Sequence, residues 1–179
     1  MRKTKSGFTI VELLIVIVVI GILAAITIVA YNGFQTRAEN IKTVNSVAAY
    51  AKGLSLYSAD KGIYPTGFGL PCLGQAPKCA NTTDGVMACF GANQTVANSG
   101  FESALSPYAS SLPTPSTQQI SCGGKQYAGA WYQPASAQSA SLLFMYKNAS
   151  ACPTIGGTSV AVFSQVGSDY LCQAVLPNL

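Results

Sequence analysis

The chain has 179 residues, of which 9% are charged, and a formal net charge of +4. Three of its ten basic residues lie within the first five positions, so the remainder is almost neutral and carries no basic stripe of the kind that binds nucleic acid. The chain has no histidine, which excludes Ser-His and Cys-His nucleophile pairs.

The first predicted element is a short basic leader followed by a long apolar helix. Arg2, Lys3 and Lys5 precede Gly7, and residues 8–30 are apolar apart from a few small polar positions and one acid, Glu12. As a helix this run would extend about 34 Å, enough to cross a bilayer core of about 30 Å. A carboxylate inside such a span costs about 2.5–3.5 kcal/mol on insertion scales, so it usually marks a function or a partner.

These residues resemble the N-terminus of type IV pilin and pseudopilin precursors. The similarity depends on the seven-residue leader, on Gly7 before Phe8, on Thr9, and on Glu12 five positions after the glycine. It implies that a membrane-embedded prepilin peptidase cuts between Gly7 and Phe8 and methylates the new N-terminus. It also implies that Glu12 pairs with the amine of a neighbouring subunit during assembly.

Physical chemistry is consistent with this pairing. Cleavage would leave an ammonium at Phe8 in hydrocarbon, where unpaired charges are expensive and each can relieve the other. Within its own apolar helix Glu12 has no expected partner, so we expect the Phe8 amine of an adjacent subunit to bind it and set the axial register. A cleaved secretory signal peptide and a plain single-pass anchor are the alternatives for this segment.

The helix is predicted to continue as an amphipathic segment to residue 62. Its apolar positions recur every three or four residues, at Ile41, Val44, Ala48, Ala51 and Leu54. Gly62 and Pro65 are expected to end the helix. The Gly62–Pro65 stretch also resembles the helix exit of pilins and pseudopilins. Many pilins have a proline where this chain has Val29, so we expect any melting of the helix to centre on Gly21.

Residues 66–98 are predicted to form a disulfide-stapled loop region, followed by a short helix through Phe101, Leu105, Tyr108 and Leu112. Four strands complete the chain and make an antiparallel sheet packed on the outer half of the long helix, an α+β fold. We expect residues 142–146 to form a central strand buried on both faces. The strands are predicted at 127–133, 141–147, 159–165 and 170–175.

The six cysteines all follow residue 70, in the part expected outside the cell, at positions 72, 79, 89, 122, 152 and 172. An even number in an exported domain predicts three disulfides, and proximity favours Cys72–Cys79, Cys152–Cys172 and hence Cys89–Cys122. Zinc is the alternative, although no C-x-x-C pair or histidine is present. We expect no cofactor and no metal.

No catalytic group of residues is predicted. The acids beyond the apolar segment are scattered along the chain, at Glu39, Asp60, Asp84, Glu102 and Asp169. The pairs Asp84-Gly85 and Ser168-Asp169 are more typical of turns than of metal ligands. Trp131, with Tyr127 and Tyr132, could line a glycan-binding surface, but strand packing is the preferred interpretation because alternation places Tyr127 and Trp131 on one side.

The predicted organisation has four parts: a cleaved leader (1–7), a transmembrane and filament-core helix (8–30), its amphipathic continuation (31–62) and an exported disulfide-rich domain (63–179). The resemblance implies a non-enzymatic pilus subunit that enters the cytoplasmic membrane with its N-terminus inside. A cell-surface homo-oligomeric filament would then form with the peptidase, assembly platform and ATPase as partners. A pseudopilin of a secretion or DNA-uptake system, or an anchored binding module, are the alternatives.

Overall fold

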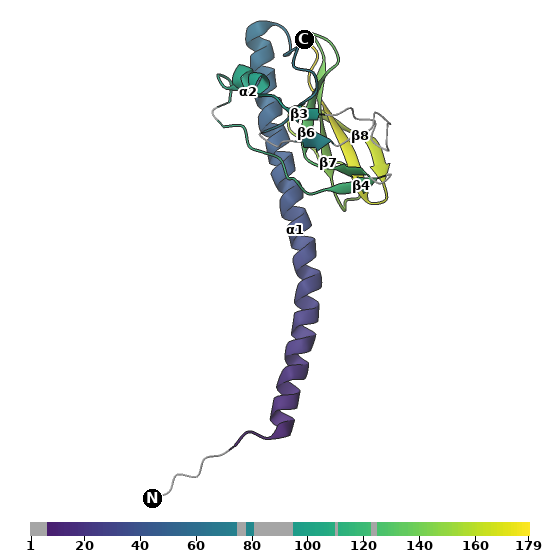
Figure 1. The fold of residues 1–179 in the computed structure, drawn as a ribbon. Helices are drawn as coiled ribbons and strands as arrows, with labels where there is room; N and C mark the ends of the chain where they lie inside the picture. Colours follow the sequence, from purple (N-terminus) through teal and green to yellow (C-terminus); the bar gives the residue numbers. More distant parts are fainter. Residues whose placement is uncertain (1–6, 75–77, 81–94, 110, 123–124) are drawn as a thin grey trace, which may run out of the picture. The chain divides into compact units, whose positions relative to one another are not determined.

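The computed structural model describes residues 7–74, 78–80, 95–109, 111–122 and 125–179. The chain divides into two compact units, Met1–Arg37 and Ala38–Leu179. Helix α1 spans Ile10–Lys61, 52 residues, and contributes to both units (Figure 1). The prediction of one helix of about this length is therefore confirmed.

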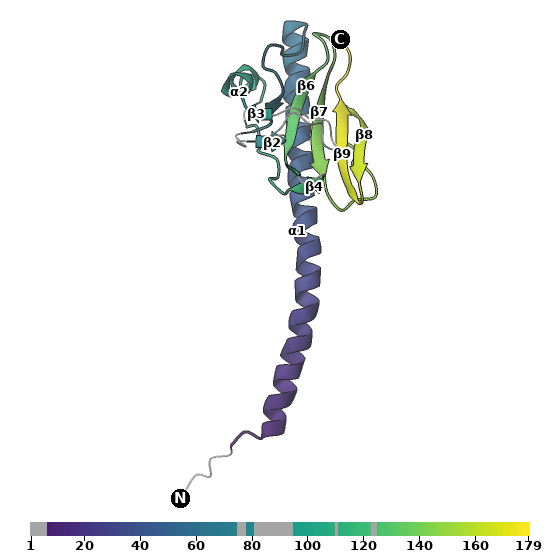
Figure 2. The same ribbon diagram turned by 45° about the vertical axis from the view of Figure 1, so that its right-hand side comes forward.

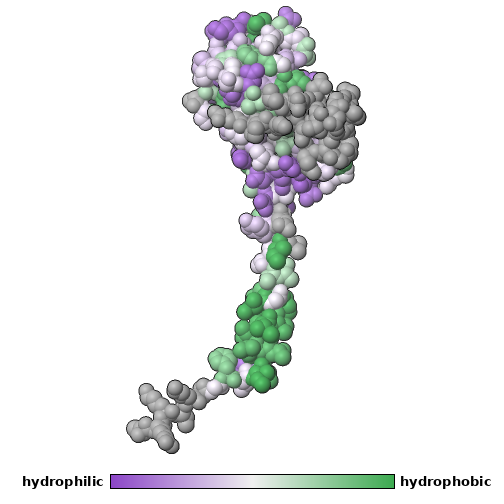
Figure 3. Space-filling view, in the orientation of Figure 1, coloured by the Kyte–Doolittle hydropathy of each residue, from purple (hydrophilic) through white to green (hydrophobic). Residues whose placement is uncertain are grey.

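In the first unit, the apolar side chains of α1 that the structure describes are all exposed. The large apolar side chains from Phe8 to Ile28 range in exposure from 48% at Val19 to 86% at Ile10. Figure 3 shows this stretch as a continuous hydrophobic surface. By length and composition α1 includes one segment able to span a membrane.

In the second unit, the buried row on α1 overlaps the predicted stripe only in part, since Ala51 and Leu54 are buried as expected. Val47, Tyr50 and Leu54 are fully buried, whereas Ile41, expected in the core, is 60% exposed. The buried row also takes in polar positions of α1, which a pattern of apolar residues cannot reveal. Val44 and Ala48 lie at its margin and are only partly buried.

The end of α1 is where the sequence predicts it. Gly62 has a φ of +69°, and its N–H donates to Ser58 O at 2.8 Å. A glycine in this left-handed conformation satisfies a free carbonyl of the last turn without a Cβ penalty. Pro65 follows outside any helix or strand.

The remainder of the second unit is a mixed but mainly antiparallel sheet beside α1 (Figures 1 and 2). Among the described residues its strand order is β4-β5-β2-β3-β1-β6-β7-β9-β8, and the β1–β3 pair is parallel while the other pairs are antiparallel. The predicted α+β class is confirmed. The strands are β1 Pro71–Cys72, β2 Lys78–Ala80, β3 Thr95–Ala97, β4 Ile120–Cys122, β5 Lys125–Tyr127, β6 Ala130–Pro134, β7 Ala140–Tyr146, β8 Ser159–Val166 and β9 Asp169–Val175.

Two strand predictions need correction. The strand expected at 127–133 is two strands, because Gly129 adopts a φ of +74° between β5 and β6. A Cβ at Gly129 would also lie 3.3 Å from Cys79 Cβ, so the backbones approach closely there. The region expected to be a loop, 66–98, contributes β1, β2 and β3 to the sheet.

The short second helix is also shorter than predicted. Helix α2 spans Ser99–Leu105 and buries Phe101 and Leu105, but it ends before Tyr108 and Leu112. Pro107 explains the early end, because a proline has no N–H with which to continue the helical hydrogen bonds, although Ser106 before it still has helical backbone.

Two apolar clusters lie on opposite faces of the sheet. Alternation along β7 sends Leu142 and Phe144 to the cluster that contains α1, and Leu143 and Met145 to the second cluster. The prediction that β7 is buried on both faces is confirmed, since its residues 140–145 are all buried.

Candidate functional site

The N-terminal candidate site is built around Thr9 and Glu12 in the first unit. The Thr9 N–H and Thr9 Oγ1 both donate to Glu12 Oε2, at 2.8 and 2.7 Å. In return, the Glu12 N–H donates to Thr9 Oγ1 at 3.2 Å. Because α1 begins at Ile10, Thr9 is the N-cap and Glu12 the third residue of the helix.

This reciprocal pair is a capping box, which satisfies two of the free N–H groups at a helix start. Glu12 therefore has a partner in its own chain, and the expectation that it would have none was wrong. The signal was present as Thr9-x-x-Glu12 immediately before an apolar run, a pattern that indicates a helix N-terminus. The carboxylate thus fixes where the helix begins.

The predicted cleavage position lies just outside this helix. Gly7, Phe8 and Thr9 have no helical assignment, and the Phe8 side chain is 83% exposed. No atom lies within 4 Å of a Cβ placed on Gly7, so nothing in the described chain crowds the Gly7–Phe8 bond. Cleavage at this bond and methylation of Phe8 remain predictions.

Gly21, predicted as the flexible point of the helix, lies within continuous α1 and is not brought near Thr9 or Glu12. A Cβ at Gly21 would meet no atom within 4 Å, so no packing contact requires a glycine there. Its role in helix melting remains a prediction.

Two disulfide bonds link described residues of the second unit. Cys72 is bonded to Cys79, which are seven residues apart, and Cys152 is bonded to Cys172. These are the two pairs favoured by proximity, and they account for four of the cysteines that the zinc alternative would need. Cys89 lies outside the described residues and the Cys122 side chain is not described, so a Cys89–Cys122 bond remains a prediction.

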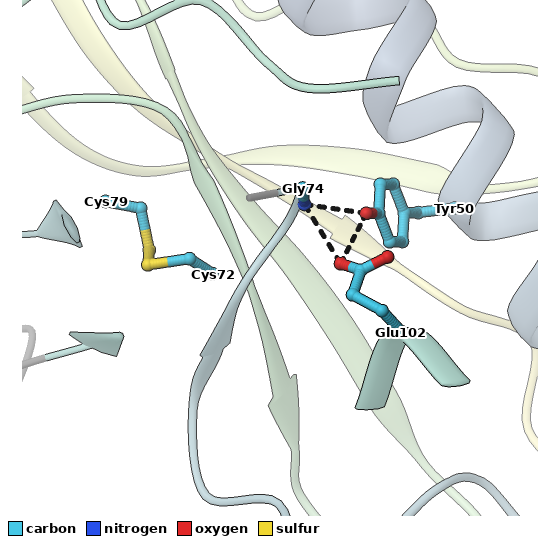
Figure 4. The surroundings of a disulfide bond; sticks show 5 residues. All are labelled: Tyr50, Cys72, Gly74, Cys79 and Glu102. Carbon is cyan, nitrogen blue, oxygen red and sulfur yellow. Dashed lines mark hydrogen bonds between the residues drawn. A yellow bond between two sulfur atoms is a disulfide. The ribbon is translucent and has the colours of Figure 1, made fainter. Parts of the chain in front are cut away.

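Next to the first disulfide, a half-buried carboxylate joins three elements (Figure 4). The Tyr50 hydroxyl of α1 donates to Glu102 Oε1 at 2.6 Å, and the Gly74 N–H lies 3.0 Å from the same oxygen and 2.6 Å from Tyr50 Oη. Burial, followed by the hydrogen bond to Glu102, raises the pKa of Tyr50 above its ordinary value. The hydroxyl therefore remains a donor to the carboxylate.

Three more polar residues of α1 form hydrogen bonds to backbone groups of distant segments of the second unit. The Asn40 side chain donates to Lys147 O at 2.7 Å and accepts from Lys147 N–H at 3.1 Å. Thr43 Oγ1 accepts from Ser116 N–H at 3.2 Å, and the Ser46 hydroxyl donates to Pro113 O. Sequence reasoning missed this polar row, because its partners are backbone groups of distant segments and leave no local signal.

The glycan-binding interpretation of the aromatic residues is not supported, since Tyr127, Trp131 and Tyr132 are all buried. Strand packing, the preferred interpretation, is confirmed for them. Among the residues that the structure describes, no group of three or more potential metal-ligating acids or cysteines comes together. Asp84 lies outside those residues.

Comparison with known proteins bears on the N-terminal region. Residues 2–28 match the family described as the prokaryotic N-terminal methylation motif. The chain is 38% identical over 65 residues to fimbrial protein EcpC of Eikenella corrodens, which covers 36% of this chain and 42% of that protein. It is 38% identical over 80 residues to type II secretion system core protein G of Escherichia coli K12, covering 43% and 55%.

A further relative is the type IV major pilin protein PilE of Neisseria gonorrhoeae, 34% identical over 65 residues, covering 36% of this chain and 39% of that protein. The chain thus matches only about half, or less, of the length of these relatives. No solved structure matches the chain. The N-terminal methylation motif and the resemblance to pilins and pseudopilins are confirmed for the N-terminal region.

Proposed function

Because its N-terminal region is related to type IV pilins and to type II secretion protein G, we propose that this chain is the structural subunit of a type IV pilus-like surface filament. It enters the membrane as a precursor, is cut between Gly7 and Phe8, and polymerises through its apolar helix. The divisions 1–7, 8–30, 31–62 and 63–179 describe the leader, the core helix, its continuation and the exported domain.

The observation that carries this proposal is the exposed apolar surface of α1. Each large apolar side chain from Phe8 to Ile28 is about half exposed or more. A continuous exposed patch of this kind marks a membrane or protein interface. Lipid would cover it in the stored subunit, and the helices of neighbouring subunits would cover it in a filament.

Glu12 gives this surface a register. Thr9 engages Oε2, and no hydrogen bond to Oε1 occurs within the described part of the chain. We assign Oε1 to the Phe8 ammonium of the neighbouring subunit. Thr9 is then a positioning residue that holds the carboxylate at the helix start, and a mismatched neighbour leaves two charges unpaired.

The proposal implies several assembly partners and a cellular location for the subunit before and after assembly. The peptidase cuts the leader, and an assembly platform with its ATPase adds subunits to the filament. The basic leader favours a cytoplasmic N-terminus, following the positive-inside bias. The subunit is then a single-pass protein of the cytoplasmic membrane before assembly and an extracellular filament component afterwards.

Replacement of Gly7 tests the proposal. Gly7→Asp should leave the precursor uncut and remove filaments from the cell surface, while wild type yields a mature chain that begins at methylated Phe8. Intact mass of the purified subunit and electron microscopy of sheared filaments provide the two readouts. A mature chain that begins at another residue, or a wild type without filaments, would contradict the proposal.

A pseudopilin of a type II secretion or DNA-uptake system is the second candidate. The 38% identity over 80 residues to type II secretion system core protein G supports it. Loss of secretion or DNA uptake in a deletion strain that lacks long surface filaments would favour this candidate, as would calcium-dependent stability of the exported domain. An uncut monomer would instead favour an anchored binding module.

A further inference from the structure

A surface groove of about 400 Å³ lies beside Glu102 in the second unit. Glu102 forms one wall from α2, and the connector that follows α2 forms another through Ala109, Leu112 and Thr114. The groove therefore presents one acid, hydroxyl groups and two apolar side chains.

Glu102 is held in place from inside the domain. Its Oε1 accepts from the Tyr50 hydroxyl and lies 3.0 Å from Gly74 N (Figure 4). No hydrogen bond to Oε2 occurs within the described residues, and the Glu102 side chain is half-buried. A fixed, partly desolvated carboxylate with one free oxygen binds a cation more strongly than a mobile surface acid.

The lining indicates the kind of cation. An alkylammonium group can donate to Glu102 Oε2 and to hydroxyl oxygens such as Thr114 Oγ1, while its methylene chain lies against Ala109 and Leu112. A lysine side chain has this combination of a compact charge and an apolar stem.

We infer that this groove binds Lys52 from a second copy of the chain. Lys52 is exposed on α1, and the positions three and four residues away are Ala48, Ala49, Ser55 and Leu56, none of them acidic. Lys42, another exposed lysine of α1, has Glu39 three residues before it. Among the described residues the ion pair present is Lys61–Asp60, so Lys52 has no ion-pair partner within them.

We assign the pairing to two copies of the chain. Tyr50 is fully buried and contacts Glu102, whereas Lys52 lies two residues further along the helix, about 200° around its axis. The exposed Lys52 side chain therefore leaves α1 on the side away from the Tyr50–Glu102 contact. Two different surfaces that complement each other make a head-to-tail contact, which builds open helical assemblies when it does not close into a ring.

This inference depends on the proposed filament, and it is tested by a double-mutant cycle in the full-length chain. Glu102→Gln removes the charge but keeps an amide oxygen for Tyr50 and Gly74, and Lys52→Gln removes the cation. Each should lower the subunit recovered in sheared filaments by up to about five-fold, the size expected for a partly exposed ion pair. The double variant should fall no further than either single variant, because the pair is already broken.

Controls separate this contact from folding and from the filament itself. Lys42→Gln changes the same charge on the same helix and should leave filament yield unchanged. Equal protease resistance of membrane-stored subunits should show that the variants fold. Independent, multiplying losses would overturn the Lys52 assignment, as would normal yield with Lys52→Gln. A wild type without filaments would instead overturn the proposed function and this contact together.

Discussion

The two units of this molecule differ in how far they bury their apolar side chains and pair their polar ones. The large apolar side chains of residues 8–28, in the first unit, are about half exposed or more, and this stretch makes few side-chain hydrogen bonds, chiefly those of the Thr9–Glu12 capping box. The second unit buries two apolar clusters and contains the disulfides Cys72–Cys79 and Cys152–Cys172. Asn40, Thr43 and Ser46 of α1 hydrogen-bond to backbone groups after β7 and in the connector before β4. The first unit needs other molecules to become stable, and the second needs only itself.

This comparison predicts that changes in the first unit abolish assembly without affecting domain stability. Glu12→Val removes the charge and half of the capping box, inserts into the membrane at least as well as wild type, and should abolish filaments. Glu12→Gln retains a capping side chain and removes only the charge. The ratio of subunit in sheared filaments to processed subunit in membranes measures both variants.

Thr9→Val is the matched variant, because it keeps the charge and removes the capping hydroxyl. If registry depends on charge, Glu12→Gln loses filaments as completely as Glu12→Val, and Thr9→Val loses fewer. Normal filaments with Glu12→Gln would show that the residue acts only as a helix cap, and the registry contact would be wrong.

A core substitution in the second unit should have the opposite effect. Phe144 is fully buried in the cluster beneath α1, and Phe144→Ala should cost about 3–5 kcal/mol of unfolding free energy through lost burial and a cavity. Trp131, the only tryptophan, is buried and reports unfolding by its fluorescence in detergent-solubilised mature chain. Unchanged membrane insertion is expected, and a defect in insertion would contradict the independence of the two units.

Removal of the Cys152–Cys172 bond should be the next largest effect. A disulfide that closes a loop of this length contributes about 2–4 kcal/mol, so the double Ser variant should unfold at a lower urea concentration. Thiol titration of unfolded, unreduced wild type should find essentially no free cysteine. Six reactive thiols would contradict the disulfides and revive the metal-site interpretation.

The smallest effect concerns a surface contact between the last turn of α1 and Tyr108. Tyr108 donates to Asp60 Oδ2 at 2.6 Å and, ahead of Lys61, lowers the pKa of Asp60 below its ordinary 3.8. A lowered folded-state pKa contributes stability that is present above 3.8 and lost as the pH falls through the lowered value. Tyr108→Phe should therefore reduce the acid-induced loss between about pH 5 and pH 2. An unchanged pH profile in urea unfolding would show that the contact contributes nothing.

Secondary structure was predicted correctly from the sequence where one local rule determines it. The 52-residue helix, its end at Gly62 and strand β7 follow from periodicity and turn chemistry, and the structure has them. The end of α2 was predictable in principle, because Pro107 lacks the N–H that a helix needs, and the capping box was equally visible as Thr9-x-x-Glu12. Both signals were local and were not used.

Other features could not be predicted from local pattern. Ile41 is exposed because α1 turns Asn40 and Thr43 toward the sheet layer, where backbone groups of Lys147 and Ser116 receive them. The face of α1 that is buried therefore depends on segments more than seventy residues away in the sequence. The Tyr50–Glu102–Gly74 contact has the same character, since it joins a helix, a second helix and a loop.

The start of α1 at Ile10 has a consequence for how a proposed filament would grow. Cleavage after Gly7 leaves only Phe8 and Thr9 before the first turn, so the new ammonium lies at the positive end of the helix dipole. Like charge at that end is unfavourable by about 0.3–1 kcal/mol at exposed sites. The N-terminus of a free, cleaved subunit would thus carry an unfavourable charge, and the carboxylate of a neighbouring subunit would neutralise it in the proposed filament. Within a filament the uncancelled charge would survive only at one end, which would mark that end for the next addition.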